Sequence, residues 1–424
     1  MNDLLERDKR LVWHPYSQAK TAGDPIAITH GKDEFLFDAD GKKYIDAVSS
    51  WWVTLHGHSN QHIADTIHKQ LQTLEHVIFS GFTHEPAVEL CERLLPLLPN
   101  SQSRFFFSDN GSTAVEIGLK MAIQFFKNKG EKRTKIIALE GAFHGETFGT
   151  MSIGDSEFLA GLYSEYLFDV IHIPVPYEGD ENRSLEALKK VLDEHEVAAF
   201  IYEPLVQGAS GMRMYSPAGL DGLIRACQSE GVFCIADEVM TGFYRTGKKF
   251  ASDWLETDPD IMALSKGLTG GTLPLALTTC TEEVFMGFYS DDVTKTLYHG
   301  HSYTGNPVGC AAALASLDLM VKPETEEKVN RIAQKHEAFA QKLESHPRVK
   351  HVRARGTILA LEVKTTGETS YFNSIRDILY NFYLERGVLL RPLGNVVYIL
   401  PPLCTSNESL EKIYETILHS LDEL

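Results

Sequence analysis

Short, almost uninterrupted runs of apolar residues alternate with longer helical patterns between positions 105 and 280. The runs are FFF at 105–107, KIIAL at 135–139, VAAFIY at 197–202, VFCIAD at 232–237 and LALTTC at 275–280. Such runs predict strands that are buried on both faces of a mostly parallel sheet. Between the first two, Val115, Leu119, Ala122 and Phe126 share one face of a helix. This alternation predicts a three-layer α/β domain.

The two ends of the chain follow other patterns. Within residues 26–52, alternating apolar positions flank the turn residues 38–41, which predicts a hairpin. Beyond Pro323, which suits the first turn of a helix, the pattern predicts helix, strand, helix, strand and helix at 324–343, 358–363, 374–386, 397–400 and 406–421. We predict a large domain over 61–323 and a smaller α+β domain built from 324–424 together with an N-terminal arm over 1–60.

Composition narrows the class of protein. The 424 residues are 43% hydrophobic with a net charge of −18, and no run of Lys and Arg could follow a phosphate backbone, so we expect no nucleic-acid partner. The six cysteines form no C-x-x-C pair, which argues against disulfides and favours a reducing compartment. No apolar stretch approaches the roughly 18 residues of a membrane helix, and the charged N-terminus is unlike a signal peptide. We expect a cytoplasmic protein with no membrane partner.

A lysine and an aspartate carry the strongest local signal. Asp237 ends the apolar run at 232–237, and Lys266 follows 29 positions later in ALSKGLTGG. Ligands of open α/β sheets bind at the edge where such strands end. There a carboxylate can hold a protonated pyridine nitrogen while a lysine supplies the amine for an aldehyde and moves a proton. In an extended chain Val239 would share the face of Asp237 and press against a flat ring. Alone, each of these residues is more often a helix cap or a surface charge.

A second signal follows the first strand. In SDNGSTAVEIGLK, Gly111 and Ser112 open a helix, where free N–H groups and the helix dipole favour a phosphate. The alternative is an ordinary capping box on Ser112, but the carboxylate that such a box needs falls at Glu116 instead.

Two further loops follow predicted strands. In GAFHGETFGTMS, Phe143 could stack on an aromatic cofactor, with His144 or Glu146 lining the site. In EPLVQGASGM, Glu203 and Gln207 come directly after the run at 197–202. Several polar strand ends that meet at one edge favour a binding site over a purely structural arrangement.

Together these motifs resemble a known family. GSTAVE, FHGET, EPLVQGASGM, DEVMTGFYRTG, SKGLTGG and HGHSYTGNPVGCAA occur in the order seen in class III pyridoxal-phosphate aminotransferases of fold type I. The resemblance implies a large domain with a mostly parallel seven-stranded sheet in three layers, a smaller α+β domain and a homodimer with a shared active site. It further implies Lys266 as the Schiff-base lysine of pyridoxal 5'-phosphate, Asp237 as the partner of the pyridine nitrogen, and Gly111 with Ser112 at the phosphate.

The sequence differs from the family's pattern at four positions of the expected site. Phe143 stands where the family has a stacked tyrosine, which removes a hydroxyl from the ring face. Ser302 stands where the family has a threonine that reaches the phosphate of the neighbouring subunit, and the serine keeps the hydroxyl. Glu146 stands where the family has an aspartate, and Leu393 where it has a phenylalanine. Both differences affect the expected recognition of the amino donor.

Within that class, WHPYS at 13–17, DAVSSWW at 46–52 and RPLGNVVYILPPL at 391–403 resemble the family of adenosylmethionine–8-amino-7-oxononanoate aminotransferases of biotin synthesis. This implies S-adenosylmethionine as donor and 8-amino-7-oxononanoate as acceptor. The implied substrate-binding residues are Tyr16, Trp51, Trp52, Phe143, Glu146, Gly300, Arg391 and Tyr398. A long aliphatic acid needs an apolar wall and a guanidinium for its carboxylate. Because neighbours on a strand face opposite ways, at most one of the two tryptophans belongs to the core.

Other functions stay open at this point. One alternative is a class III transaminase for an ω-amino acid such as ornithine or 4-aminobutyrate, and another keeps the acceptor but takes lysine as donor. A cofactor-binding regulator without catalysis is disfavoured by the intact Lys266 and Asp237. The H-x-H pairs at 56/58 and 299/301 lack acidic or cysteine partners at ligand spacing, so we expect no metal site.

Overall fold

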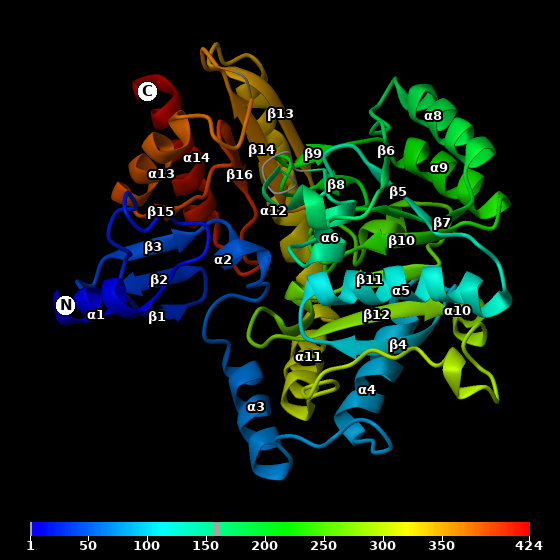
Figure 1. The fold of residues 1–424 in the computed structure, drawn as a ribbon. Helices are drawn as coiled ribbons and strands as arrows, with labels where there is room; N and C mark the ends of the chain where they lie inside the picture. Colours follow the sequence, from blue (N-terminus) through cyan, green and yellow to red (C-terminus); the bar gives the residue numbers. More distant parts are fainter. Residues whose placement is uncertain (1, 156–160, 368) are drawn as a thin grey trace.

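The computed structural model describes residues 2–155, 161–367 and 369–424 (Figure 1). Its main sheet has seven strands in the order β4-β12-β11-β10-β7-β5-β6. The strands are β4 (Gln102–Ser108), β5 (Lys135–Leu139), β6 (Ile171–Ile173), β7 (Val197–Tyr202), β10 (Phe233–Asp237), β11 (Ile261–Leu264) and β12 (Ala276–Thr281). Neighbouring strands are parallel except for β12, which runs antiparallel to both β11 and β4. The predicted fold class is therefore confirmed, and all five predicted strands belong to this sheet.

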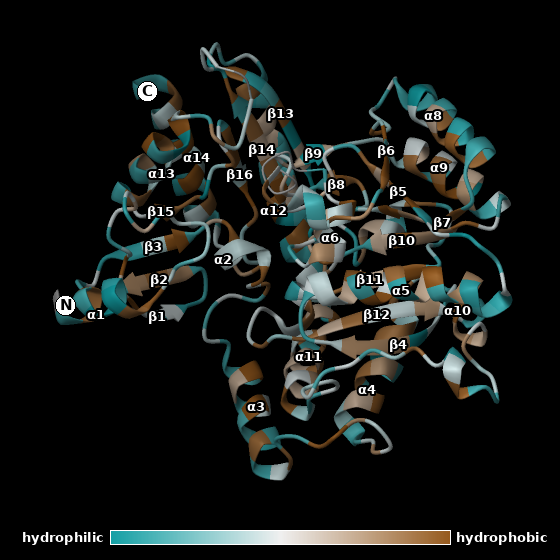
Figure 2. Ribbon diagram, in the orientation of Figure 1, coloured by the Kyte–Doolittle hydropathy of each residue, from teal (hydrophilic) through white to brown (hydrophobic). Residues whose placement is uncertain are grey.

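Alternate residues of the central strands enter two separate cores. In β10, Ile235 packs with helix α5 (Gly111–Lys129), whereas Cys234 and Ala236 belong to the core that contains helix α9 (Pro217–Ser229). Strand residues that point to opposite faces and are all buried require a helical layer on each side. Figure 2 shows the strands of this sheet in hydrophobic colours and the outer helix α8 (Glu181–Glu194) largely in hydrophilic ones.

Segments from both ends of the chain form a second sheet. Its order is β1-β2-β3-β15, from β1 (Ile28–Lys32), β2 (Phe35–Asp38), β3 (Lys43–Asp46) and β15 (Val388–Leu389). Strands β2 and β3 form the predicted hairpin, and β15 runs parallel to β3. A third sheet joins β13 (Val349–Arg355), β14 (Ile358–Val363) and β16 (Val396–Ile399), and β8 (Val206–Gln207) pairs with β9 (Arg213–Met214). The domain boundaries at 60 and 323 stay a prediction.

The remaining helices are α1 (Asn2–Leu11), α2 (Ser49–Trp52), α3 (Gln61–Thr73), α4 (Glu85–Leu94), α6 (Phe148–Ile153), α10 (Glu282–Met286), α11 (Pro307–Met320), α12 (Pro323–Glu344), α13 (Ile375–Glu385) and α14 (Asn407–Glu423). Short 3-10 turns are η1 (Leu95–Leu97), η2 (Ser164–Tyr166), η3 (Ala251–Trp254), η4 (Lys266–Thr269) and η5 (Val293–Lys295). Helix α12 begins at Pro323, as predicted. Over the described residues, none of the helices combines the length and apolarity needed to span a membrane.

The expectation that Trp51 and Trp52 lie on a strand is wrong. The chain leaves β3 at Asp46 and turns through α2, whose four residues all have positive φ, from 44° to 73°. The argument from opposite strand faces therefore does not apply. One of the two rings is nevertheless largely buried, since Trp52 is 5% exposed and Trp51 is 38% exposed.

Candidate active site

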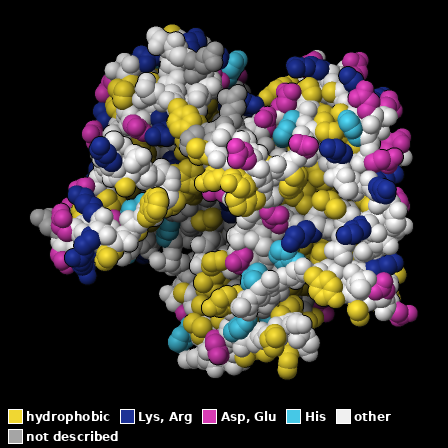
Figure 3. All heavy atoms as spheres, in the orientation of Figure 1, with side chains coloured by type: hydrophobic (Ala, Val, Ile, Leu, Met, Phe, Trp, Pro, Cys, Tyr) yellow, Lys and Arg dark blue, Asp and Glu magenta, His cyan; other side chains and the backbone are white. Residues whose placement is uncertain are grey.

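A cavity of about 2150 Å³ lies where the strands of the main sheet end. Figure 3 shows a hollow on this face of the molecule between two lobes, with hydrophobic side chains around it. All but two of the residues predicted for the site line this cavity: Tyr16, Trp51, Trp52, Gly111, Ser112, Phe143, Glu146, Asp237, Val239, Lys266, Arg391 and Tyr398. They come from segments almost 400 positions apart, and the sheet brings the motifs together at one edge, as expected for an open α/β fold.

Lys266 and Asp237 come off neighbouring parallel strands. Asp237 is the last residue of β10, paired with Ala263 of β11, and Lys266 follows two positions after β11. Lys266 has a φ of 49°, a left-handed backbone that a non-glycine residue adopts only where its surroundings enforce it. Its Nζ lies 4.6 Å from the centroid of the Trp52 ring. Burial lowers the pKa of Lys266 to about 8, against the opposing charges of Asp237 and Glu203, so much of the amine is neutral near pH 8.

Asp237 is fixed by two partners. Its Oδ2 lies 2.7 Å from Nδ1 of His144, which is buried, and its Oδ1 accepts from the backbone N–H of Val239 at 3.1 Å. The chain therefore turns directly after Asp237, and the expectation of an extended Asp237–Val239 segment is wrong, although both residues line the cavity. The sequence predicts His144 on the wall of the site but predicts no partner for it. Its contact with Asp237 forms only once strands β5 and β10 are in place in the sheet.

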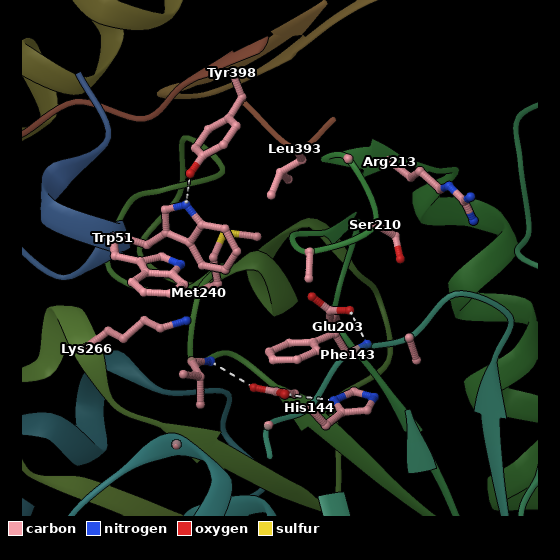
Figure 4. A pocket seen from close by; sticks show the side chains of 18 of the residues that line it. Trp51, Phe143, His144, Glu203, Ser210, Arg213, Met240, Lys266, Leu393 and Tyr398 are labelled. Carbon is pink, nitrogen blue, oxygen red and sulfur yellow. Dashed lines mark hydrogen bonds and ion pairs between the residues drawn. The ribbon is translucent and has the colours of Figure 1, made fainter. Parts of the chain in front are cut away.

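Glu203 connects two of the predicted loops. Its carboxylate accepts from the N–H of Phe143 at 3.1 Å and from the N–H of Gly208 at 2.8 Å. Burial is the largest cause that raises the pKa of Glu203, and the nearby Asp237 adds to it, to about 7. Figure 4 shows the Phe143 ring beside this carboxylate, with Lys266 entering the cavity from the opposite side. Glu203 therefore fixes the backbone that carries Phe143.

The start of α5 has the form predicted for an anion site. Asn110, not Ser112, is the N-cap, and its side chain accepts from the N–H of Thr113 at 3.0 Å. The capping box considered for Ser112 is thus absent. Within the described chain, the N–H groups of Gly111 and Ser112 donate to no acceptor, and both residues line the cavity. A Cβ on Gly111 would lie 2.6 Å from Cγ1 of Val239, so only glycine allows this approach.

Aromatic rings form another part of the cavity wall. Trp51 meets Tyr16 edge to face at a centroid distance of 5.1 Å, and the guanidinium of Arg391 lies 4.6 Å from the Trp51 ring. The Nε1–H of Trp52 donates to the hydroxyl of Tyr398 at 3.0 Å. The arrangement combines an apolar wall with one guanidinium, which suits an aliphatic chain that ends in a carboxylate.

Gly300 and Ser302 are not brought to this cavity. Neither residue lines it, and both are exposed. The surrounding segment displays aromatic side chains, since Tyr298 is 72% and Tyr303 67% exposed.

Three histidines of the two H-x-H pairs form hydrogen bonds with other side chains. His58 bonds to Asp46 at 2.9 Å and His56 to Ser316 at 3.1 Å. His299 lies 3.0 Å from the amine of Lys120. Among the described residues, no group of three His, Cys, Asp or Glu side chains is arranged to hold a metal ion.

Some residues of the site were not predicted. Met240 and Arg213 line the cavity, and the fully buried Arg245 donates to the carbonyl oxygens of Pro401 at 2.9 Å and of Trp52 at 3.4 Å. Met240 directly follows Val239 and could have been proposed from that position. Arg245 stands in the motif DEVMTGFYRTG, but the motif alone does not predict its contacts, because its partners lie about 150 and 190 positions away.

Comparisons with known proteins agree with this geometry. Residues 16–421 match the family described as Aminotransferase class-III. A relative from Synechococcus elongatus, named adenosylmethionine-8-amino-7-oxononanoate aminotransferase, is 45% identical over 97% of this chain and 99% of its own length. A relative of the same name from Geobacter sulfurreducens is 37% identical over 99% of this chain and 97% of its own.

Solved structures lead to the same group. A crystal structure of adenosylmethionine-8-amino-7-oxononanoate aminotransferase from Methanocaldococcus jannaschii superposes with a TM-score of 0.95 at 35% identity, covering 100% of this chain and 99% of that one. An omega transaminase from Pseudomonas jessenii in complex with PMP has a TM-score of 0.92 at 28% identity, covering 99% and 98%. The chain belongs to the class III aminotransferases, a family of pyridoxal-phosphate-dependent enzymes.

Proposed function

We propose that the protein transfers the amino group of S-adenosylmethionine through pyridoxal 5'-phosphate to 8-amino-7-oxononanoate, giving 7,8-diaminononanoate for biotin synthesis. The relatives that carry this name support the assignment. The observation that carries it in the structure is the aromatic wall of Trp51, Trp52 and Tyr398 with Arg391 at its side, next to Lys266 and Asp237.

The cavity fits pyridoxal phosphate. The free N–H groups of Gly111 and Ser112 suit its phosphate. Asp237 provides a buried carboxylate for its pyridine nitrogen and Lys266 an amine for its aldehyde. Phe143 provides a flat ring, and Val239 an apolar side chain, for the two faces of the cofactor's ring. When bound, this cofactor supplies an electron sink for the carbon that loses a proton.

The protein's own groups supply proton transfer and charge. His144 and the N–H of Val239 each bond to one oxygen of the Asp237 carboxylate, and together they fix its orientation at the cavity. The lowered pKa of Lys266 leaves a neutral amine that can take a proton from a carbon and return it at a neighbouring position. The transfer would need two half-reactions, because the bound cofactor would hold the donor's amino group until the acceptor takes it.

Arg391 is the residue we assign to the acceptor's carboxylate. A guanidinium binds a carboxylate with two parallel hydrogen bonds, and Trp51 beneath it excludes water from one side. The aliphatic chain of the acceptor would lie along Trp52 and Tyr398, while Tyr16 closes the edge of Trp51. Glu146 at the cavity wall and Leu393, which also lines it, are assigned to donor recognition.

The position of Gly300 and Ser302 supports a homodimer. Both are exposed and absent from the cavity of their own chain, in a segment with exposed Tyr298 and Tyr303. Exposed aromatic surface of this kind marks protein interfaces. We assign Ser302 to the phosphate, and Gly300 to the substrate, of a second copy.

The donor is tested by single-turnover spectra of the holoenzyme. S-adenosylmethionine should bleach the absorbance of the bound cofactor, whereas lysine and 4-aminobutyrate should leave it unchanged. If only lysine bleaches it, the donor assignment is wrong and the acceptor stands; if only 4-aminobutyrate does, the enzyme is an ω-amino acid transaminase.

The role of Lys266 is tested by substitution. Borohydride should attach the cofactor to Lys266 in the wild type, and Lys266→Ala should lose this label and about 10²- to 10⁴-fold of its turnover. The matched control is Lys335→Ala, which removes a lysine paired with Glu411 on another surface. Full turnover in Lys266→Ala would overturn the assignment.

A further inference from the structure

Four consecutive residues, none of them glycine, form a left-handed turn beside the cavity. Ser49, Ser50, Trp51 and Trp52 have φ values of 49°, 44°, 73° and 73°. L-residues disfavour this conformation because Cβ approaches the following carbonyl oxygen, and it normally occurs at single positions. The turn closes with its own bonds, Trp52 N–H to Val48 O at 2.9 Å and Val53 N–H to Ser49 O at 2.9 Å. A run of four disfavoured residues persists only where the surroundings enforce it.

Asp46 binds the inner side of this turn. Its side chain is fully buried, and its Oδ1 accepts from the N–H of Ser50 at 2.9 Å and of Val48 at 3.3 Å. Its Oδ2 accepts from the hydroxyl of Ser50 at 2.8 Å and lies 2.9 Å from Nε2 of His58. Both carboxylate oxygens of Asp46 therefore bond to the turn, and Oδ2 also contacts His58.

The C-terminal segment holds the other side. The hydroxyl of Ser49 donates to the carbonyl of Leu400 at 2.8 Å, and the guanidinium of Arg245 bonds both Pro401 O and Trp52 O. This arrangement fixes the positions of the two indole rings. Trp52 reaches the Lys266 amine and Trp51 reaches Arg391, so both rings touch groups assigned to the reaction.

We infer that Asp46 is a positioning residue for the substrate pocket: its carboxylate holds residues 49–52 in the left-handed turn and thereby sets the Trp51 and Trp52 rings against Arg391 and Lys266. Asp46 itself does not line the cavity, so it acts through the tryptophans. Without it, the N–H and hydroxyl of Ser50 lose their acceptors and the turn can relax toward right-handed backbone, which redirects both side chains. The inference rests on the proposed function only in taking this cavity as the substrate site.

The first test reads the tryptophans directly. The chain has four tryptophans, so 5-fluorotryptophan labelling of the holoenzyme gives four fluorine signals, assigned by single Trp→Phe variants. In Asp46→Ala, the signals of Trp51 and Trp52 should shift or split, while Trp254, which lies outside the cavity lining, stays in place. Asp46→Asn keeps an acceptor oxygen and should retain the wild-type signals. This readout needs no substrate, so it stands or fails independently of the proposed reaction.

The second test separates positioning from stability. Asp221 is a matched control, because its buried carboxylate also accepts backbone N–H groups, from Glu256 and Thr257, but does not line the cavity. Asp46→Ala should lower kcat/KM for the acceptor by about a hundredfold, mainly through KM. Asp221→Ala should lower thermal stability and leave KM unchanged.

Equal effects of Asp46→Ala and Asp221→Ala on the fluorine signals and on KM would overturn the inference, as would unchanged Trp51 and Trp52 signals in Asp46→Ala. If Asp46→Ala does not fold, Ser50→Ala removes only the bond to Oδ2 and should give the same changes at smaller size. Unchanged signals in that variant would overturn the inference as well.

Discussion

Lys266 is an amine whose surroundings act on its charge in opposite directions. Burial lowers its pKa most, Asp237 and Glu203 raise it, and Arg245 lowers it further, with a result of about 8. The free amine is the form that reacts with an aldehyde. At the residue scale, burial thus favours the neutral amine, and the two nearby carboxylates limit how far its pKa falls.

This predicts the pH dependence of cofactor capture by the apoprotein. Below pH 8 the protonated amine is inactive, so the rate of pyridoxal phosphate binding through Lys266 should rise about tenfold per pH unit and level off above pH 8. For the control Nα-acetyl-lysine, the rate should rise until about pH 10.5, the ordinary pKa of a lysine side chain. Stopped-flow absorbance measures both. A protein profile that levels off with the control would contradict the lowered pKa.

At the scale of elements, the start of α5 depends on the turn after β10. Gly111 lies against Val239, whose N–H donates to Asp237, so the parts of the site proposed for the phosphate and for the ring share one contact. The helix was predicted from its apolar face and its Gly-Ser start. The contact with Val239 was not, because the two residues are 128 positions apart.

Gly111→Ala should weaken cofactor binding by more than about tenfold, because the added methyl group would lie 2.6 Å from Val239 and push the helix start away. Val239→Ala in the same chain opens space and should recover part of the loss. Gly222→Ala is the control, since a Cβ there meets nothing within 4 Å. Absorbance titration of the apoproteins gives the affinities. Wild-type affinity in Gly111→Ala, or no recovery in the double variant, would contradict this account.

Elements also differ in how far local pattern predicts them. The five strands with apolar runs were found, but β6 and β11 are only three and four residues long, too short for a periodic signal. The sequence predicts a strand at α2, since its apolar residues follow β3 directly. Its left-handed backbone depends on Asp46, Arg245 and Leu400, which no window of neighbouring residues contains.

At the scale of the whole molecule, the cavity is assembled from both ends of the chain and the main sheet. Tyr16, Arg391 and Tyr398 meet Lys266 and Asp237 there. Ser302 stays outside it, on the surface. A second copy that supplies Ser302 would complete each site, so the dimer is part of the proposed function and not only of stability.

Mixed dimers test this directly. Lys266→Ala and Ser302→Asp should each inactivate the homodimer, the second by repulsion of the phosphate. A purified mixed dimer contains one site with both native residues, so it should recover about half of the wild-type activity. Carrying both substitutions on one chain and pairing it with wild type gives the control, with no native site. Absence of recovery in the mixed dimer would place Ser302 in its own subunit's site, and a fully active Ser302→Asp homodimer would place it near neither site.

The sequence alone predicted the layers and the main strands, because apolar periodicity is a local property, and the resemblance of its motifs to class III aminotransferases predicted the chemistry of the site. The motifs predict that Lys266, Asp237, Gly111 and Ser112 lie together at one edge of the sheet. Tertiary structure decided which groups touch: His144 on Asp237, Glu203 on the Phe143 loop and Asp46 under the two tryptophans. These contacts join residues that are distant in sequence, and their geometry exists only once the sheet and both ends of the chain have packed.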